Sequence, residues 1–236
     1  MTQPASLLRR AGAELVGTAF LVMAVIGSGI AAVRLSPGDI GLQLLENSLV
    51  TGAALVALIL ALQPVSASFN PVVTLVERLL GQVSTKEATV LSGAQIVGGL
   101  TGAALANLMF GLHAVTFSSH LRSGPSLWLG EVLATLGLVL VVFGTLRSGR
   151  PQSVAVAVGG YITAAYWFTS STSFANPAVT VARMLSDTFA GIAPTSVPMF
   201  LVAQVGGGLL GLALVHLLFP VQEVVRASDR TARSAD

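Results

Sequence analysis

The sequence predicts an all-α integral membrane protein with six membrane-spanning helices and two re-entrant half-helices, arranged as an inverted repeat. Three observations lead to this prediction. Only 9% of the 236 residues are charged and 53% are hydrophobic, whereas soluble domains carry about 25% charged residues. The chain contains six long apolar stretches. Its two halves carry the same short motifs in the same order.

The six apolar stretches approach or reach the roughly 20 residues that a helix needs to cross a bilayer. They are Ala11 to Val33, Leu42 to Leu62, Ala88 to Phe110, Leu127 to Leu146, Ser153 to Phe168 and Val197 to Phe219. The first stretch follows two arginines, as a secretory signal would. It contains Glu14 and has no convincing cleavage site, so we interpret it as an uncleaved first helix.

The basic residues predict the orientation in the membrane. With the N- and C-termini in the cytoplasm, nine basic residues lie on the cytoplasmic side and three lie outside. The cytoplasmic set is Arg9, Arg10, Arg78, Lys86, Arg147, Arg150, Arg226, Arg230 and Arg233, and the external set is Arg34, Arg122 and Arg183. The net charge of +2 therefore reflects topology, and we expect no nucleic-acid partner. Residues 220–236 are predicted to be a solvated cytoplasmic tail.

Three pairs of motifs define two half-repeats, at about residues 8–111 and 125–219. The pairs are Glu14-Leu-Val-Gly-Thr18 with Glu131-Val-Leu-Ala-Thr135, Asn70-Pro-Val-Val-Thr74 with Asn176-Pro-Ala-Val-Thr180, and Ala94 to Leu105 with Ala203 to Leu214. Because each half contains three spans, an odd number, the second half must be inserted upside down relative to the first. An inverted repeat of this kind places its binding site near the middle of the membrane.

The two Asn-Pro boxes each follow a loop of small polar residues and begin a helix too short to span the bilayer. Asn is a strong N-cap and Pro suits the first helical position. Two half-helices entering from opposite faces would bring two positive dipole ends together and repel cations and hydrated protons. The Asn amides could then donate hydrogen bonds to a neutral solute. The simpler alternative is a pair of interfacial helices, but the duplication favours a pore centre made of Asn70, Pro71, Val72, Asn176, Pro177 and Ala178.

Glu14 and Glu131 are carboxylates inside predicted spans, which is costly unless each has a partner or a function. A proton relay is one interpretation. The symmetric placement favours a structural one, in which each carboxylate accepts hydrogen bonds from N–H groups of a re-entrant loop. There are no cysteines, and the three scattered histidines form no metal-ligand pattern. No nucleophile and base pair occurs in the spans, so we expect neither an enzyme nor a cofactor.

Together these motifs resemble the aquaporin and glycerol-facilitator (major intrinsic protein) superfamily, whose mark is two Asn-Pro-Ala boxes in inverted halves. The segment from Phe174 to Pro194 is similar to the bacterial branch often encoded beside arsenic-resistance genes. The resemblance implies the aquaporin fold, with residues 1–236 forming one channel domain in the bacterial inner membrane. It also implies a passive channel and a homotetramer, with membrane lipid and small neutral solutes as partners.

Departures from the family pattern predict the substrate. Val72 replaces the usual Ala of the first box, Ser68 stands where many members have His, and Thr180 where glycerol facilitators have Asp. By spacing from the Asn residues, the family's selectivity filter falls on Val50, Ala164, Ser173 and Val179, with Val179 in place of the filter arginine. None of these four is charged, which predicts a wide and weakly polar constriction.

A constriction of this kind favours glycerol, undissociated arsenite or antimonite, and water as solutes. A water-selective aquaporin and an ion-coupled secondary transporter with inverted repeats are the alternatives.

Overall fold

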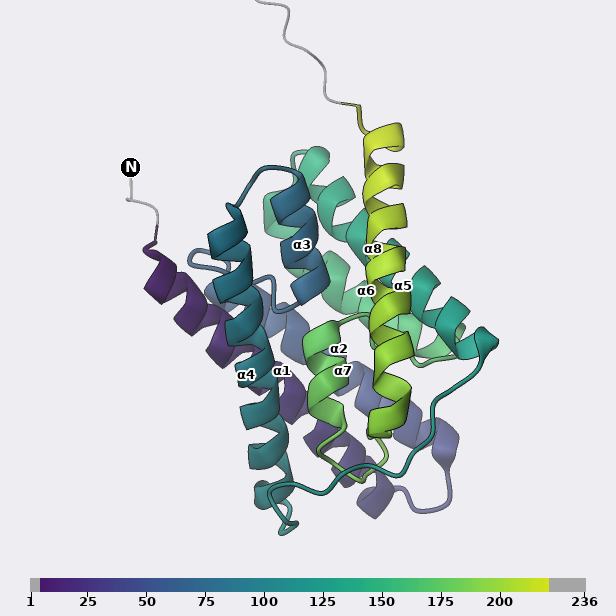
Figure 1. Cartoon of the computed structure of the whole chain (residues 1–236). Coiled ribbons are helices and arrows are strands. Elements are labelled where there is room, and N and C mark those ends of the chain that lie inside the picture. The colour runs from purple at the N-terminus through teal and green to yellow at the C-terminus, as the bar shows by residue number, and fades with distance from the viewer. Residues whose placement is uncertain (1–4, 221–236) are drawn as a thin grey trace, which may run out of the picture.

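The computed structural model describes residues 5–220, and those residues form helices and loops with no β-strand (Figure 1). Proline or a capping polar residue begins most of the helices. The helices are α1 (Leu7–Leu35), α2 (Ile40–Leu62), α3 (Pro71–Leu79), α4 (Thr85–Met109), α5 (Pro125–Arg147), α6 (Val154–Phe168), α7 (Pro177–Arg183) and α8 (Val197–Leu218). Two short 3₁₀ turns, η1 (Pro151–Ser153) and η2 (Pro194–Ser196), precede α6 and α8.

Within the described residues, five helices are long and apolar enough to cross a membrane: α1, α2, α4, α5, and α8 together with η2. The sixth predicted span corresponds to α6, which has only 15 residues. At 1.5 Å per residue this helix covers about 22 Å, less than the ~30 Å of hydrocarbon in a bilayer. The η1 turn adds residues at one end, and the polar loop after Phe168 ends the helix at the other.

The long helices pack in two equivalent pairs, α1 against α4 and α5 against α8. Small residues allow each pair to approach closely, because a side chain at Gly98 or Gly102 would collide with the backbone of α1. Gly207 and Gly211 occupy the same positions on α8 and face the backbone of α5. The repeated glycines of the sequence are therefore the places where the two long helices within each half-repeat contact each other.

The short helices α3 and α7 stand between the long helices, and their N-termini point toward each other (Figure 1). Each begins at an Asn-Pro pair, as the sequence predicts. The Asn70 Oδ1 accepts a hydrogen bond from the Val72 N–H at 3.0 Å. The Asn176 Oδ1 accepts bonds from the N–H groups of Ala178 and Val179, at 3.0 and 3.3 Å.

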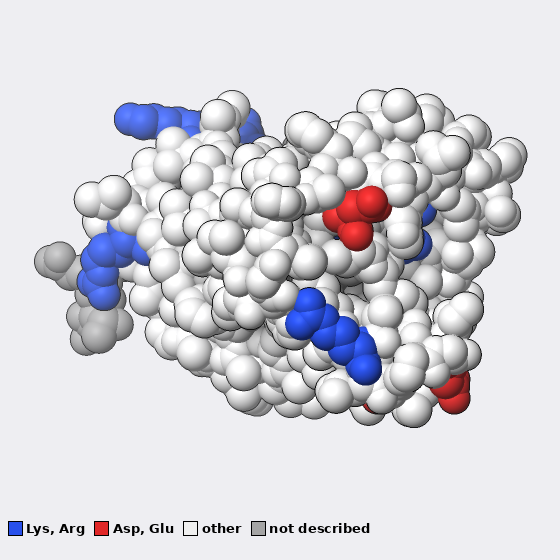
Figure 2. All heavy atoms as spheres, turned by 90° about the horizontal axis from the view of Figure 1, so that it is seen from below, with Lys and Arg blue, Asp and Glu red and all other residues white. Residues whose placement is uncertain are grey.

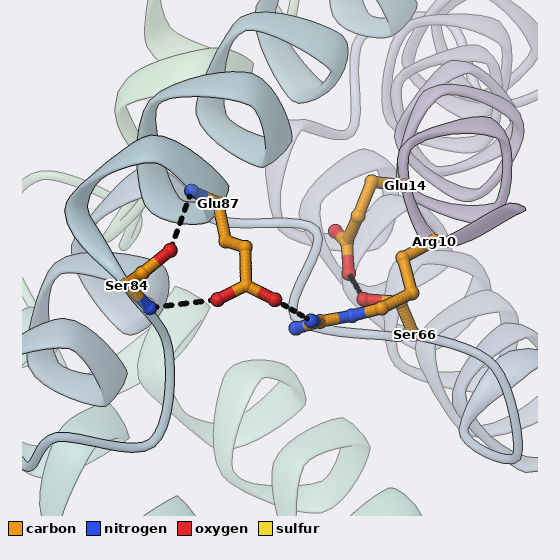
Figure 3. A network of polar contacts seen from close by, with 5 residues as sticks. All are labelled: Arg10, Glu14, Ser66, Ser84 and Glu87. Atoms are coloured by element: carbon orange, nitrogen blue, oxygen red, sulfur yellow. Dashed lines mark hydrogen bonds and ion pairs between the residues drawn. The ribbon is translucent and has the colours of Figure 1, made fainter. Parts of the chain in front are cut away.

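Both ends of the described chain lie at one end of the bundle, here called the terminal face, and the connection between α4 and α5 crosses the opposite face (Figure 1). At the terminal face Arg10 of α1 forms an ion pair with Glu87 of α4 at 2.9 Å. Glu87 and Ser84 also form a capping box at the start of α4 (Figure 3). The predicted tail, with Arg226, Arg230 and Arg233, lies outside the described residues apart from Pro220.

Candidate functional site

A cavity of about 560 Å³ runs along the interior between the two re-entrant segments. Its walls are largely aliphatic, with side chains from α1, α2, α5 and α6. Near the terminal face it is lined by Gln63, Pro64 and Gln152, and toward the opposite face by Thr51 and Tyr166. It therefore extends past the level at which α3 and α7 meet.

Asn70 and Asn176 both lie on the wall of this cavity. The Asn70 amide nitrogen donates to the carbonyl oxygen of Ala175, and the Asn176 amide nitrogen donates to that of Phe69, both at 2.8 Å. Each amide thus holds the loop of the opposite half-repeat. An amide nitrogen carries two hydrogens, so each Asn retains one N–H that can be donated to a solute.

The other residues of the two boxes do not line the cavity. Val72 is buried and fits against α8 where Gly208 has no side chain; a Cβ there would collide with the Val72 side chain. Ala178 is buried, and its carbonyl group lies close to Gly99 of α4. The larger Val72 in place of the usual Ala is therefore accommodated by helix packing and does not enter the cavity. Pro71 and Pro177 occupy the first position of their helices.

Glu14 accepts four hydrogen bonds from the first half-repeat. Its carboxylate receives the N–H groups of Ser68 and Phe69 at 2.9 and 2.7 Å, the Ser66 hydroxyl at 2.5 Å and the Gln95 amide at 2.8 Å. Figure 3 shows the Glu14 side chain pointing from α1 toward Ser66 of the loop. These are the contacts that the structural interpretation of the carboxylate requires.

Glu131 has the equivalent contacts in the second half-repeat. It accepts the N–H groups of Phe174 and Ala175 at 2.8 and 2.9 Å and the Gln204 amide at 2.6 Å. Ala175 and its counterpart Phe69 have positive φ angles of 47° and 48°, a conformation that is costly for residues other than glycine. The carboxylates hold both loops in this conformation.

Gln95 and Gln204 are buried polar residues whose role the sequence alone does not reveal. The structure places each of them between the buried Glu of its half-repeat and the Thr that follows the Asn-Pro box, Thr74 or Thr180, at 3.0 and 2.8 Å. The signal was present in the sequence, because the two Gln residues align between the halves within otherwise apolar helices.

Two of the four predicted filter positions lie on the cavity wall. Val179 and Ser173 are buried and line the cavity, and the Ser173 hydroxyl has no hydrogen-bond partner among the described residues. Val50 and Ala164 do not line it: Val50 is 44% exposed on the outside of the bundle, and Ala164 is exposed as well.

Thr51 and Tyr166 line the cavity instead, and their hydroxyl groups lie 3.2 Å apart. Each is close in sequence to the position that spacing predicted, Val50 or Ala164. Counting from an Asn across a loop fixes the position only to within a residue or two, and each residue turns the side chain by about 100° around the helix. The prediction that Val50 and Ala164 line the cavity is therefore wrong, because both side chains point to a different side of their helices from Thr51 and Tyr166.

Two charged side chains that the sequence analysis did not place in the site also line the cavity. Arg183, which the charge count predicts to lie on the external side of the membrane, is buried within the bundle and only 2% exposed. Glu77 lines the cavity nearer the terminal face, where its carboxylate accepts a hydrogen bond from the Ser68 hydroxyl at 2.9 Å. The cavity wall therefore carries two charged side chains besides the uncharged positions predicted for the constriction. Both residues stand seven positions after an Asn, one helical turn beyond Val73 or Val179, which is the signal that could have revealed them.

Comparisons with known proteins agree with this architecture. The model of the family described as "Major intrinsic protein" matches residues 1–153 and 149–235. The aquaglyceroporin AqpS of Rhizobium meliloti (strain 1021) is 46% identical over 229 residues, covering 96% of this chain and 97% of that protein. The lens fiber major intrinsic protein of Oryctolagus cuniculus is 34% identical over 235 residues, covering 92% of this chain and 83% of the relative.

A similar fold occurs among solved structures. The aquaglyceroporin from Plasmodium falciparum aligns with a TM-score of 0.69 at 19% sequence identity, covering 92% of this chain and 97% of that one. At this identity the likeness concerns the fold alone, and it agrees with the long helices and two re-entrant half-helices described above.

Proposed function

The chain belongs to the major intrinsic protein family, and we propose that the cavity between its two Asn-Pro boxes is the pore through which it conducts glycerol and water. The protein is a passive membrane channel for small neutral solutes. The observation that carries the assignment of the pore is the position of Asn70 and Asn176. Both lie on the wall of one cavity, and each has one amide N–H that is not used in holding the opposite loop.

The lining supports hydroxylated solutes as cargo. A solute that enters a narrow pore loses hydrogen bonds to water, and it crosses readily only where the wall replaces them. Here the cavity lining combines aliphatic side chains of α1, α2, α5 and α6 with both Asn amides and the hydroxyl groups of Ser173, Thr51 and Tyr166. Glycerol can place its carbon chain against the aliphatic side chains and its hydroxyls against these polar groups.

Undissociated arsenite and antimonite belong to the same proposal. Both carry three hydroxyl groups and no charge at neutral pH, so the same donors and acceptors can replace their hydration. We further propose that the protein lies in a bacterial plasma membrane with both termini in the cytoplasm and assembles as a homotetramer. The relative from Rhizobium meliloti, a bacterium, supports this location.

Stopped-flow light scattering on proteoliposomes tests the proposal. Vesicles with the purified protein should take up glycerol at least about tenfold faster than protein-free vesicles, and the rate should saturate only weakly with concentration, as expected for a channel. A pH dye trapped in the vesicles and labelled arsenite added outside show whether solute uptake is coupled to proton movement. Glycerol entry no faster than in protein-free vesicles would refute the proposed cargo, and uphill accumulation driven by a proton gradient would indicate a coupled carrier.

A further inference from the structure

Glu77 and Arg183 occupy the same position in the two half-repeats, seven residues after Asn70 and Asn176, yet they carry opposite charges. Both side chains line the cavity. We infer that Arg183 is a specificity-determining residue of the pore, whose guanidinium excludes cations and donates hydrogen bonds to the oxygen atoms of neutral solutes. This inference rests on the proposed function, because it assigns a role within the same pore.

The contacts of Arg183 leave most of its donors available. Its Nε donates to the carbonyl oxygen of Ala190. The guanidinium carbon lies 3.4 Å from the centre of the Phe174 ring, which also lines the cavity. Among residues 5–220, neither terminal nitrogen of Arg183 has a hydrogen bond to another group. Arg183 also has no ion pair among these residues, because the ion pair found there joins Arg10 to Glu87. A guanidinium has five N–H donors, so four face no protein acceptor.

The direction of the side chain brings the charge back toward the constriction. Side chains of a helix tilt toward its N-terminus, so a residue at the last turn of α7 reaches back over the preceding turn. The contact with Phe174, two residues before Asn176, is the evidence that Arg183 does so. Ser173, whose unpaired hydroxyl lines the same cavity, precedes Phe174 directly. Arg183 therefore belongs to the part of the wall that Val179 leaves without a charge.

Burying this charge is expensive, which argues against a purely structural role. A guanidinium that is only 2% exposed and has no carboxylate partner loses most of its hydration without an ion pair in return. The opposite face of the molecule, to which α7 points, shows few charged side chains on its surface (Figure 2). An ionisable group retained inside a membrane protein and facing a cavity indicates a functional site. A neutral residue could fill the space beside Phe174 at lower cost.

Arg122 provides a matched comparison within the same chain. Its guanidinium also stacks on Phe174, at 5.2 Å, and it also holds the segment after α7 through the carbonyl oxygens of Phe189 and Gly191, at 3.3 and 2.8 Å. Arg122 does not line the cavity. The two arginines therefore share the structural contacts, and only Arg183 faces the pore.

The test compares R183M, R183Q, R183K and R122M in proteoliposomes, with a trapped pH dye for proton leak and light scattering for glycerol and water. R183M and R183Q should increase the proton leak about tenfold or more, because the fixed charge is lost. R183M should also lower the ratio of glycerol to water flux. R183Q should lower this ratio less, because its amide can still donate hydrogen bonds to glycerol. R183K should keep the proton exclusion, and R122M should keep both properties of the wild type.

Size-exclusion profiles identify the variants that are folded. An unchanged leak and flux ratio in folded R183M or R183Q would overturn the inference, as would an equal change in R122M, since the contacts with Phe174 and the loop would then explain the effect. If wild-type protein conducts neither glycerol nor water above protein-free vesicles, the proposed function fails as a whole. Wild-type flux combined with unaltered Arg183 variants would overturn only the role of Arg183.

Discussion

The two re-entrant segments share a framework but differ in the chemistry that they present to the cavity. In each, a buried Glu, a Gln and a Thr hold the loop and the half-helix, and an Asn caps the helix and binds the opposite loop. Seven residues after the Asn, the first segment has an acidic side chain and the second a basic one. The two halves therefore share the groups that hold the backbone and differ at a position that lines the cavity.

The residues paired with these charges differ in the same way. Glu77 accepts a hydrogen bond from Ser68, and Arg183 stacks on Phe174; Ser68 and Phe174 both stand two residues before an Asn. One end of the cavity is thus lined by a carboxylate with a hydroxyl, and the other by a guanidinium with an aromatic ring. The comparison predicts that changes in the shared framework affect stability in both halves, and that changes in the diverged positions affect selectivity with little effect on stability.

The largest expected effect is on the framework. E14L should destabilise the protein more than E131L, because Glu14 accepts four hydrogen bonds and Glu131 accepts three. Each buried donor left without an acceptor costs about 1–3 kcal/mol. The melting temperature in detergent should fall strongly for both, and E14Q and E131Q should be milder because an amide oxygen still accepts.

Transport measurements on the same variants separate the two interpretations of these carboxylates. If E14L melts at the wild-type temperature and loses only a pH-dependent part of transport, the carboxylate is a proton relay and the shared framework does not depend on it. If the order of E14L and E131L is reversed, the number of accepted bonds does not determine the cost.

The second expected effect is at the cavity wall one turn before the diverged residue Arg183. V179R should lower glycerol and arsenite flux about tenfold, which corresponds to about 1.4 kcal/mol in the barrier, and water flux much less. Val179 lies one turn before Arg183 on the same face of α7. A guanidinium at position 179 would therefore narrow the cavity and repel the guanidinium of Arg183. V181R is the matched control, because Val181 lies on α7 but does not line the cavity.

Stopped-flow assays with glycerol, arsenite and water measure the effect of V179R. Equal losses for all three solutes would indicate misfolding. Unchanged flux in a folded V179R protein would show that this position does not limit permeation and that the wall is wider than its lining residues suggest.

A smaller effect tests the corrected positions on α2. T51V removes a hydroxyl that lines the cavity and lies 3.2 Å from the Tyr166 hydroxyl, so glycerol flux should change about two- to fivefold, as expected for one hydrogen bond. V50A alters the neighbouring residue, which faces outward, and should leave flux unchanged. A larger effect of V50A than of T51V would restore the original filter position.

These positions also show what the sequence could predict. The boxes at Asn70 and Asn176 and the carboxylate at Glu14 were found because they recur in the second half, and a repeated pattern identifies an inverted framework. Val50 was misplaced because spacing across a loop of unknown geometry does not fix helix rotation. Counting charges along the chain assigns Arg183 to one side of the membrane, but it does not show that a residue at the end of a half-helix is buried beside the cavity.

The smallest expected effect concerns how each half-helix is anchored at its outer end. After α3 the chain enters α4 within six residues, whereas after α7 it runs through a longer segment that contacts the α4–α5 connection. Asp187 fastens this segment by accepting hydrogen bonds from the N–H and hydroxyl groups of Ser119, at 2.9 and 3.0 Å. These bonds lower the pKa of the Asp187 carboxyl below its ordinary value of 3.8.

Because the folded-state pKa is depressed, the contribution of Asp187 to stability is present above the ordinary pKa of 3.8 and is lost as the pH falls through the lower folded value. Asp187 is exposed, so solvent screens the contacts, and D187N should lower the melting temperature at pH 7 by only about 1–2 °C. The difference between D187N and wild type should shrink as the pH falls below about 4. Differential scanning fluorimetry in detergent at several pH values measures both quantities. A difference in melting temperature that persists unchanged at pH 3 would mean that the charge of the Asp187 carboxylate does not anchor the segment. The contrast between the outer ends of α3 and α7 would then depend on backbone hydrogen bonds, such as the one from the Ser118 N–H to the Met184 carbonyl oxygen.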